Sequence, residues 1–278
     1  MKQDPRTILT DEQIFGRLPT IVTRTNETIP TFHWVPDKPD NRDYIYQISV
    51  PKTPQSVDLR TYATPVEDQG QLGSCTGNAI AEAIELLNRK ANKPTEISRL
   101  FIYYEERVLE GTVNEDAGAY IRDGIKVVNK KGAPLESLWP YIENKVLVKP
   151  VQLAYTNALT RRALNYQRCL NFTAVRAAIA AGYPVVVGFT VYESFESGTW
   201  WYPNGTGLMP YPDANIEDIL GGHAVCLVGY NDNSRTFIAR NSWGTSWGKR
   251  GYFYMPYQVI QDTDMSDDFW IITSISNP

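Results

Sequence analysis

The sequence predicts an α+β protein with two lobes, the first helical and the second built mainly of strands. Apolar residues recur at helical spacing within about residues 64–162, whereas β-type runs separated by glycine-rich turns occupy about residues 163–278. Helices followed by strands along the chain are typical of an α+β fold. The 278 residues are enough for a sizeable core and for two lobes that share a cleft.

Residues 1–55 differ from the rest in composition. They contain seven prolines and few periodic apolar runs, so we expect an extended segment that lies on another part of the molecule. One short helix is expected in "TDEQIFGRL", with Thr10 as its N-cap. His33 and Trp34 leave two interpretations open: a strap packed on the body, or a plug that limits access to a cleft.

Four further helices follow from helical periodicity and their end signals. Three lie in the first lobe and the fourth opens the second, and glycines close several of them. A short basic helix is also expected just before Cys169. The four segments are "NAIAEAIELLNRK" (78–90), "SRLFIYYEERVLEG" (98–111), "AYIRDGIKVVNKKG" (119–132) and "TAVRAAIAAG" (173–182).

Five β-rich apolar runs predict the strands of the second lobe. The most apolar window, residues 177–191, is short and contains Gly182 and Pro184, so we assign it to the core rather than to a membrane span. The runs are "YPVVVGFTV" (183–191), "HAVCLVGYN" (223–231), "RTFIARNSW" (235–243), "GYFYMP" (251–256) and "FWIITSI" (269–275).

Charge and composition argue against several classes of protein. The net charge is −4 and no block of lysines or arginines occurs, so neither a nucleic-acid surface nor a basic membrane-binding helix is expected. Residues 1–30 lack a basic segment followed by an apolar stretch, so we expect no signal peptide. Three cysteines are too few for a disulfide scaffold and fit a reducing compartment.

Cys75 stands where a thiolate would be stabilised. It lies at the expected start of a helix, in "QGQLGSCTGNA", and Gly73 and Gly77 leave room for the backbone of another molecule to approach. A helix N-terminus and a nearby cation both lower the pKa of a thiol. The position therefore favours a reactive cysteine over a buried structural one.

Partners for a nucleophilic cysteine occur further along the chain. A base is required, and His223 opens an apolar strand directly after Gly222, which keeps the approach to the ring accessible. Asn241 follows a later strand and can orient the imidazole. Gln69 can supply a side-chain amide beside the Cys75 backbone N–H, which gives two donors for a developing oxyanion.

These residues carry a resemblance to a known family. The order of Gln69, Cys75, His223 and Asn241, with the tracts "QGQLGSC", "GHAVCLVGY" and "RNSWGTSWGKRGYFY", resembles the papain-like cysteine peptidases over about residues 56–278. The resemblance implies a helical lobe, a β-barrel-like lobe and an active site in the cleft between them. The tract "HWVPDKPDNRDYIY" resembles the N-terminal segment of xylellain-like and giant-virus members, so residues 1–55 are expected to be inhibitory or cleft-covering.

The resemblance also implies a role for each residue of the site. Cys75 is the expected nucleophile, His223 the general base and acid, Asn241 the residue that orients the imidazole, and Gln69 the oxyanion donor. Trp243 is expected to shield the hydrogen bond between Asn241 and His223 and to line the leaving-group side.

Other assignments from the resemblance concern the substrate and two departures from the family pattern. Gly118, in "NEDAGAY", is expected in a strip that pairs with the substrate backbone, and Gly222 in the wall of the pocket for the second residue on the acyl side. Leu72 stands where the family often has a cysteine, which removes a disulfide partner. Thr76 stands in place of a tryptophan and changes the packing behind the nucleophile.

The expected function is hydrolysis of polypeptide substrates through a Cys–His thiolate–imidazolium pair and a thioester acyl-enzyme, without a metal or organic cofactor. We expect a monomeric zymogen-like endopeptidase inside a cell or carried in a virion; exopeptidase action stays open if residues 1–55 or the 197–220 loop block one end of the cleft. Two alternatives are a non-catalytic binding module and an amidase or transpeptidase acting on cell-wall peptides. The intact Cys75, His223 and Asn241 set disfavours the first, and Gln69 with the "NSWG" tract disfavours the second.

Overall fold

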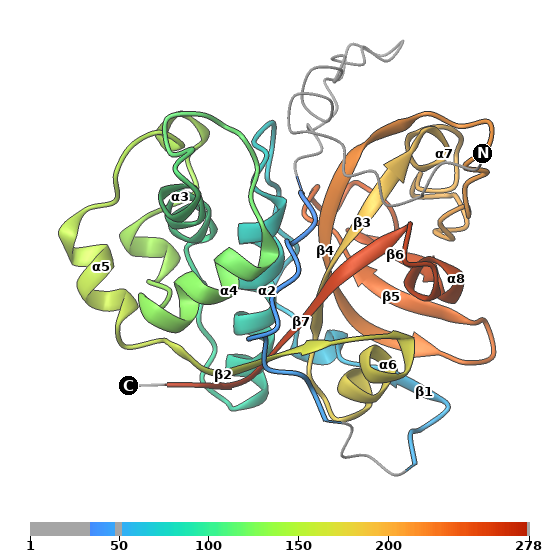
Figure 1. Ribbon diagram of the computed structural model, residues 1–278, viewed down its shortest axis with the longest axis horizontal. Coiled ribbons are helices and arrows are strands. Elements are labelled where there is room, and N and C mark those ends of the chain that lie inside the picture. The colour runs from blue at the N-terminus through green and yellow to red at the C-terminus, as the bar shows by residue number, and fades with distance from the viewer. Residues whose placement is uncertain (1–33, 48–51, 277–278) are drawn as a thin grey trace.

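The computed structural model describes residues 34–47 and 52–276 and shows a helical lobe beside a large antiparallel sheet (Figure 1). The helix expected in "TDEQIFGRL" and the side chain of His33 lie outside the described residues. The α+β class with two lobes is confirmed. In the part of the chain that the structure describes, no helix is long and apolar enough to cross a membrane.

The helical lobe is arranged around one buried helix, α2 (Cys75–Lys90). This helix contacts two other helices of its lobe and strands of the sheet, so nearly all of its residues are buried. The three helices expected in this lobe are confirmed, whereas α5 was not predicted. The others are α3 (Arg99–Glu110), α4 (Ile121–Lys130) and α5 (Gln152–Ala158), with 3-10 turns η1 (Arg60–Tyr62), η2 (Glu136–Leu138) and η3 (Glu143–Lys145).

The second lobe is one antiparallel sheet in the strand order β2-β7-β3-β4-β5-β6, with β1 paired to β4. Because β2 and β6 lie at opposite ends of this order, the sheet is open in the described residues rather than closed into a barrel. All five predicted strands are present. The elements are β1 (Ser56–Asp58), β2 (Ala163–Cys169), α6 (Phe172–Ala180), β3 (Val185–Tyr192), α7 (Glu193–Glu196), β4 (Ile219–Asn231), β5 (Thr236–Arg240), β6 (Tyr252–Pro256), α8 (Tyr257–Gln261) and β7 (Ser266–Ile275).

The basic helix expected before Cys169 was a wrong prediction, because this segment is strand β2. It pairs with β7, and Arg168 makes ion pairs with Asp267 and Asp268 of that strand. Pairing with a partner more than 90 residues away decides the structure here, which local periodicity cannot detect.

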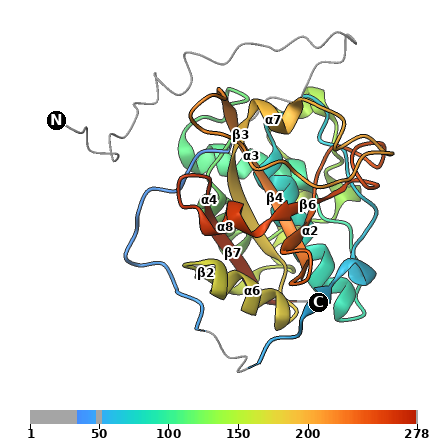
Figure 2. The ribbon, with the colours of Figure 1, turned by 90° about the vertical axis from the view of Figure 1, so that its right-hand side faces the viewer.

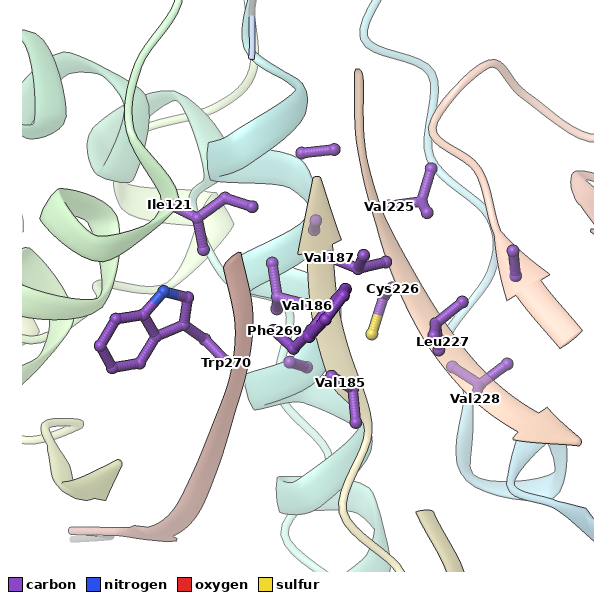
Figure 3. Packing of buried hydrophobic residues seen from close by; sticks show 14 of the residues in the cluster. Ile121, Val185, Val186, Val187, Val225, Cys226, Leu227, Val228, Phe269 and Trp270 are labelled. Carbon is purple, nitrogen blue, oxygen red and sulfur yellow. The ribbon is translucent and has the colours of Figure 1, made fainter. Parts of the chain in front are cut away.

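The core lies between α2 and the sheet. Valines of β3 and apolar residues of β4 and β7, among them Val186, Cys226 and Trp270, fill this space (Figure 3). Buried packing of this kind fixes the start of α2 relative to β4.

Residues 34–47, which we call the strap, run between the two lobes and then along the outside of the molecule past β2 (Figures 1 and 2). At one end, Trp34 pairs in parallel with Ala119 of the helical lobe and donates its backbone N–H to Gly222 of β4 at 2.8 Å. At the other end, Ile45 pairs in parallel with Arg168 of β2. The strap therefore bridges both lobes.

Candidate active site

Cys75 is the first residue of α2 and is fully buried. The preceding Ser74 does not cap the helix with its side chain; its hydroxyl instead lies 2.6 Å from that of Tyr141 and accepts from the amide of Asn78. The positive end of the helix dipole therefore lies at the thiol, and the Ser74 side chain caps none of the backbone N–H groups there. A helix N-terminus of this kind favours a thiolate.

His223 and Asn241 meet across neighbouring strands β4 and β5. His223 Nε2 lies 2.8 Å from Asn241 Oδ1, which also accepts the backbone N–H of Ser242 at 2.9 Å. The bond from Ser242 identifies the acceptor atom of the Asn241 amide, so Nε2 of His223 is assigned as the protonated nitrogen. Nδ1 is then the ring nitrogen that can accept a proton.

The imidazole of His223 is almost completely buried. Burial lowers its pKa to about 4, and the hydrogen bond to Asn241 opposes this shift only in part. The indole of Trp243 stacks on the ring with centroids 4.8 Å apart, and Phe189 approaches it edge-on. Burial of the ring therefore disfavours its charged form.

The loop before α2 is bound to the segment after β5. Gln69 donates its backbone N–H to Ser242 O at 2.8 Å and accepts the Ser242 hydroxyl on Oε1 at 2.6 Å. Its side-chain amide donates to Leu72 O at 2.7 Å, which uses one of its two N–H groups. These bonds bring Gln69 and the start of α2 to the segment that carries Asn241. Ser242, which makes them, was not singled out from the sequence.

Trp243 is the residue that we expected to shield the hydrogen bond between Asn241 and His223, and in the structure it packs against the imidazole. It stacks on His223, and Trp247 and Phe195 pack against its ring at centroid distances of 5.2 and 5.9 Å. Trp243 is itself buried. The imidazole of His223 is thus packed against one edge of an aromatic cluster.

The strip that contains Gly118 faces the strap. Gly118 has a φ of +75° and gives its N–H to the hydroxyl of Tyr103 at 3.0 Å, whereas the next residue, Ala119, is the one paired with Trp34. Ala119 was not predicted from the sequence. Its position directly after Gly118, in a run of small residues, is the signal that could have identified it.

Two glycines make room for the side chain of Trp34. A Cβ atom on Gly188 of β3 would lie 1.9 Å from Cε2 of the indole, and one on Gly222 would lie 2.7 Å from Cε3. The indole therefore rests on bare backbone of β3 and β4, and Gly222 is the residue directly before His223. Gly188 was not singled out from the sequence, because its role depends on contact with a residue 154 positions earlier (188 − 34).

The other cysteines lie away from this arrangement. Cys169 and Cys226 are buried, none of the three cysteines forms a disulfide, and burial raises the pKa of Cys169 to about 12. Within the ranges 34–47 and 52–276, no group of three or more His, Cys, Asp or Glu side chains is arranged to hold a metal ion.

A separate pocket lies on the helical-lobe side of the strap. Its lining includes Asp37 and Pro39 of the strap and Glu110 and Tyr120 of the helical lobe, but neither Cys75 nor His223. We place the candidate chemistry at Cys75, because hydrogen bonds through Ser242 join the loop directly before it to Asn241, the partner of His223.

Comparisons with known proteins agree with this geometry. The model of the papain family cysteine proteases matches residues 53–272. An uncharacterised peptidase C1-like protein of Acanthamoeba polyphaga mimivirus is 40% identical over 281 residues, covering 89% of this chain and 88% of its own. Xylellain, a cysteine protease from Xylella fastidiosa, superposes with a TM-score of 0.80 at 39% identity, covering 88% and 96% of the two chains. Procathepsin L 3 of Tenebrio molitor, at 21% identity and a TM-score of 0.63 over 82% and 74%, shares the fold.

Proposed function

This chain belongs to the papain family of cysteine proteases, and from that membership we propose that it hydrolyses peptide bonds with Cys75 as nucleophile and His223 as general base and acid. The observation that carries the proposal is the pair of hydrogen bonds that Asn241 Oδ1 accepts, one from His223 Nε2 and one from Ser242 N. It leaves Nδ1 of His223 as the proton acceptor for a thiol.

The proposed reaction has two steps. The thiol proton of Cys75 passes to Nδ1 of His223, the sulfur attacks the carbonyl carbon, and the oxyanion is bound by the Gln69 amide and the Cys75 N–H. His223 then protonates the leaving amine, and the thioester remains. Water gives a proton to His223 and attacks the thioester, which releases the acid and restores the thiol.

We further propose that the strap inhibits the enzyme reversibly. Trp34 bonds to the carbonyl of Gly222, directly before His223, and its buried indole lies on Gly222 and Gly188, so a peptide bound along this backbone would have to displace it. Endopeptidase action is proposed, because Trp34, which lies between Ala119 and Gly222, is an internal residue of the chain and not a terminus.

The test compares four full-length proteins on a fluorogenic dipeptidyl amide. Cys75→Ala is expected to abolish cleavage. Trp34→Gly is expected to lower KM by roughly tenfold with little change in kcat, because it weakens an intramolecular competitor. Lys38→Ala, which changes an exposed side chain of the same strap, is the control.

Retention of cleavage by Cys75→Ala would remove the assignment of the nucleophile. A chain that cleaves no member of a broad peptide panel, even with Trp34→Gly, would point to the binding-module alternative. Equal KM values for Trp34→Gly and the parent would contradict inhibition by the strap and leave the peptidase assignment intact.

A further inference from the structure

One carboxylate of the helical lobe joins three segments that surround the candidate site. Asp116 accepts the backbone N–H of Gly73 at 3.1 and 3.2 Å on its two oxygens, and it accepts the hydroxyl of Tyr103. The oxygen of Tyr103 in turn accepts the N–H of Gly118 at 3.0 Å. We call these four residues the Asp116 clasp.

The direction of these bonds is fixed by the chemistry of Tyr103. Its side chain is fully buried on α3, and burial with the nearby carboxylate raises the pKa of the phenol far above its usual value. The phenol therefore keeps its proton and donates it to Asp116, which leaves its oxygen as the acceptor for Gly118.

A buried arginine holds the other side of the same loop. Arg107 lies over the ring of Tyr103, with the guanidinium carbon 4.2 Å from the centroid, and donates to the carbonyl of Glu115 at 2.6 Å. It also donates to the carbonyl of Val113. Residues 113–118 are thus held from two directions, and the position of Asp116 is well defined.

The two ends of the clasp lie at the two functional parts of the site. Gly73 lies between Gln69 and Cys75, in the turn whose Leu72 carbonyl accepts the Gln69 amide. Gly118 precedes Ala119, the residue that pairs with the extended strap. Because Leu72 stands in place of a cysteine, no disulfide can hold this turn at that position. The hydrogen bonds from Gly73 to Asp116 connect the turn to the strip instead.

We propose that Asp116 is a positioning residue that couples the backbone strip at 118–119 to the turn carrying the oxyanion donors. Through Gly73 it sets the orientation of the turn before Cys75, and through Tyr103 it sets the strip on which an extended peptide lies. The inference rests on the proposed peptidase function and adds a residue that touches neither substrate nor thiol.

The two halves of the clasp should affect different kinetic constants, KM for the Gly118 side and kcat for the Gly73 side. Tyr103→Phe removes the acceptor for Gly118 and keeps the bond from Gly73, so KM should rise about 5-fold with kcat within about 2-fold of the parent. Asp116→Ala removes the acceptor for the Gly73 N–H and for the Tyr103 hydroxyl. The value of kcat should therefore also fall, and kcat/KM should drop at least about 10-fold. The variants are made in the full chain carrying Trp34→Gly, and both constants are measured on one fluorogenic peptide.

Conservative and neighbouring changes serve as controls. Asp116→Asn retains an oxygen that can accept from Gly73 and from Tyr103, so it should recover most of the activity lost in Asp116→Ala. Glu115→Gln removes the exposed carboxylate next in sequence, and Tyr104→Phe removes the next hydroxyl on the same helix; both should leave kcat and KM unchanged.

Amide hydrogen exchange separates failure of this inference from failure of the peptidase assignment. Asp116→Ala should speed exchange at Gly73 and Gly118 whether or not the chain cleaves peptides. If exchange speeds up while kcat and KM stay at parental values, the clasp is structural only and the inference is overturned. If exchange is unchanged, the bonds themselves are not significant in solution, and the inference is overturned on that ground.

Discussion

Gly188 and Gly222 set the size of the space that the indole of Trp34 occupies. Both lie under the indole of Trp34, and neither position tolerates a Cβ atom while the indole is in place. A glycine in a strand packs poorly and loses entropy on folding, so its presence in β3 indicates that another group approaches the backbone there.

Gly188→Ala is expected to exclude Trp34 from its position. The new Cβ would lie 1.9 Å from an indole carbon, which is far inside van der Waals contact. For a peptide with small side chains, KM should fall by about the same factor as in Trp34→Gly, roughly tenfold. For a peptide whose aromatic side chain would take the place of the Trp34 indole on Gly188, KM should rise. Steady-state kinetics with this substrate pair measure both effects.

The double variant Gly188→Ala with Trp34→Gly distinguishes the two causes. If the methyl group acts through the strap, adding it to Trp34→Gly should not lower KM further for the small peptide. A further fall would show that Gly188 acts on the substrate alone.

At this scale the sequence could predict the residues whose chemistry is required in any thiol-based site. Cys75, His223, Asn241 and Gln69 are candidates by residue type and order, and bonds through Ser242 join Gln69 to Asn241. Ala119 and Gly188 could not be predicted with the same certainty, because their positions matter only through backbone and indole contacts that are remote in sequence.

The strap is anchored at the level of whole elements by a buried polar cluster. Asp37 donates its N–H to Asp268 of β7 at 2.7 Å and accepts from the indole of Trp270 and the backbone of Arg122. Arg122 and Asp43 form a second pair at 2.7 Å. Burial raises the pKa of Asp37, and Arg122 is the largest influence that opposes this shift.

Asp37→Ala should destabilise the folded protein by about 3–5 kcal/mol, because it leaves the Trp270 N–H and the Arg122 N–H buried without their acceptor. Chemical denaturation of the Cys75→Ala background gives the free energy of unfolding without self-cleavage. Asp40→Ala, which breaks an exposed pair with Arg42 in the same strap, should have a much smaller effect on this free energy, because water screens the pair. Equal effects of the two substitutions would contradict the anchor.

Element boundaries show what local sequence can and cannot determine. Helices α2, α3 and α4 were predictable because their apolar periodicity and terminal residues are local signals. Strand β2 and the position of the strap were not, since each is set by pairing with β7 or β2 across the molecule. The change in composition near residue 55 likewise does not mark where packing starts, because Trp34, Asp37 and Tyr46 are buried.

Several carboxyl groups buried in the helical lobe influence the stability of the whole molecule. Burial raises the pKa of Glu85 to about 7 and that of Glu110 to about 8, and it raises the pKa of Glu106 well above its usual value. Unfolded, these groups lose their protons near pH 4.5. The folded protein therefore binds more protons across pH 5–8, and its stability falls as the pH rises through this window. His223, with its lowered pKa, acts in the opposite direction only between about pH 4 and 6.5.

We expect the unfolding temperature of the Cys75→Ala chain to decrease by roughly 5–10 °C between pH 5.5 and pH 8. Calorimetry at a series of pH values measures this change. Glu110→Gln should flatten the curve, because it removes the group whose pKa is raised to about 8. A profile that is level or rises toward pH 8 would show that these carboxyls are ionised in the folded protein.

The two-lobe architecture was predictable from the order of helices and strands, and family resemblance supplied the placement of the site. The open edges of the sheet and the path of the strap across both lobes depend on packing between distant segments. Those long-range contacts explain why the sequence leaves two interpretations open for the N-terminal segment, a strap packed on the body or a plug that limits access to a cleft.

The outer strand of the sheet has a further consequence. β2 ends the strand order on one side, and an unpaired strand at such a position is a template for another chain, leading to domain swapping or fibrous aggregation. The strap contacts this edge: Tyr46 donates to Arg168 O at 2.8 Å, and Arg168 N donates to Tyr44 O at 2.7 Å. The same segment that pairs with Ala119 and Gly222 thus covers the sheet edge against intermolecular pairing, so a substitution that releases the strap should also promote self-association.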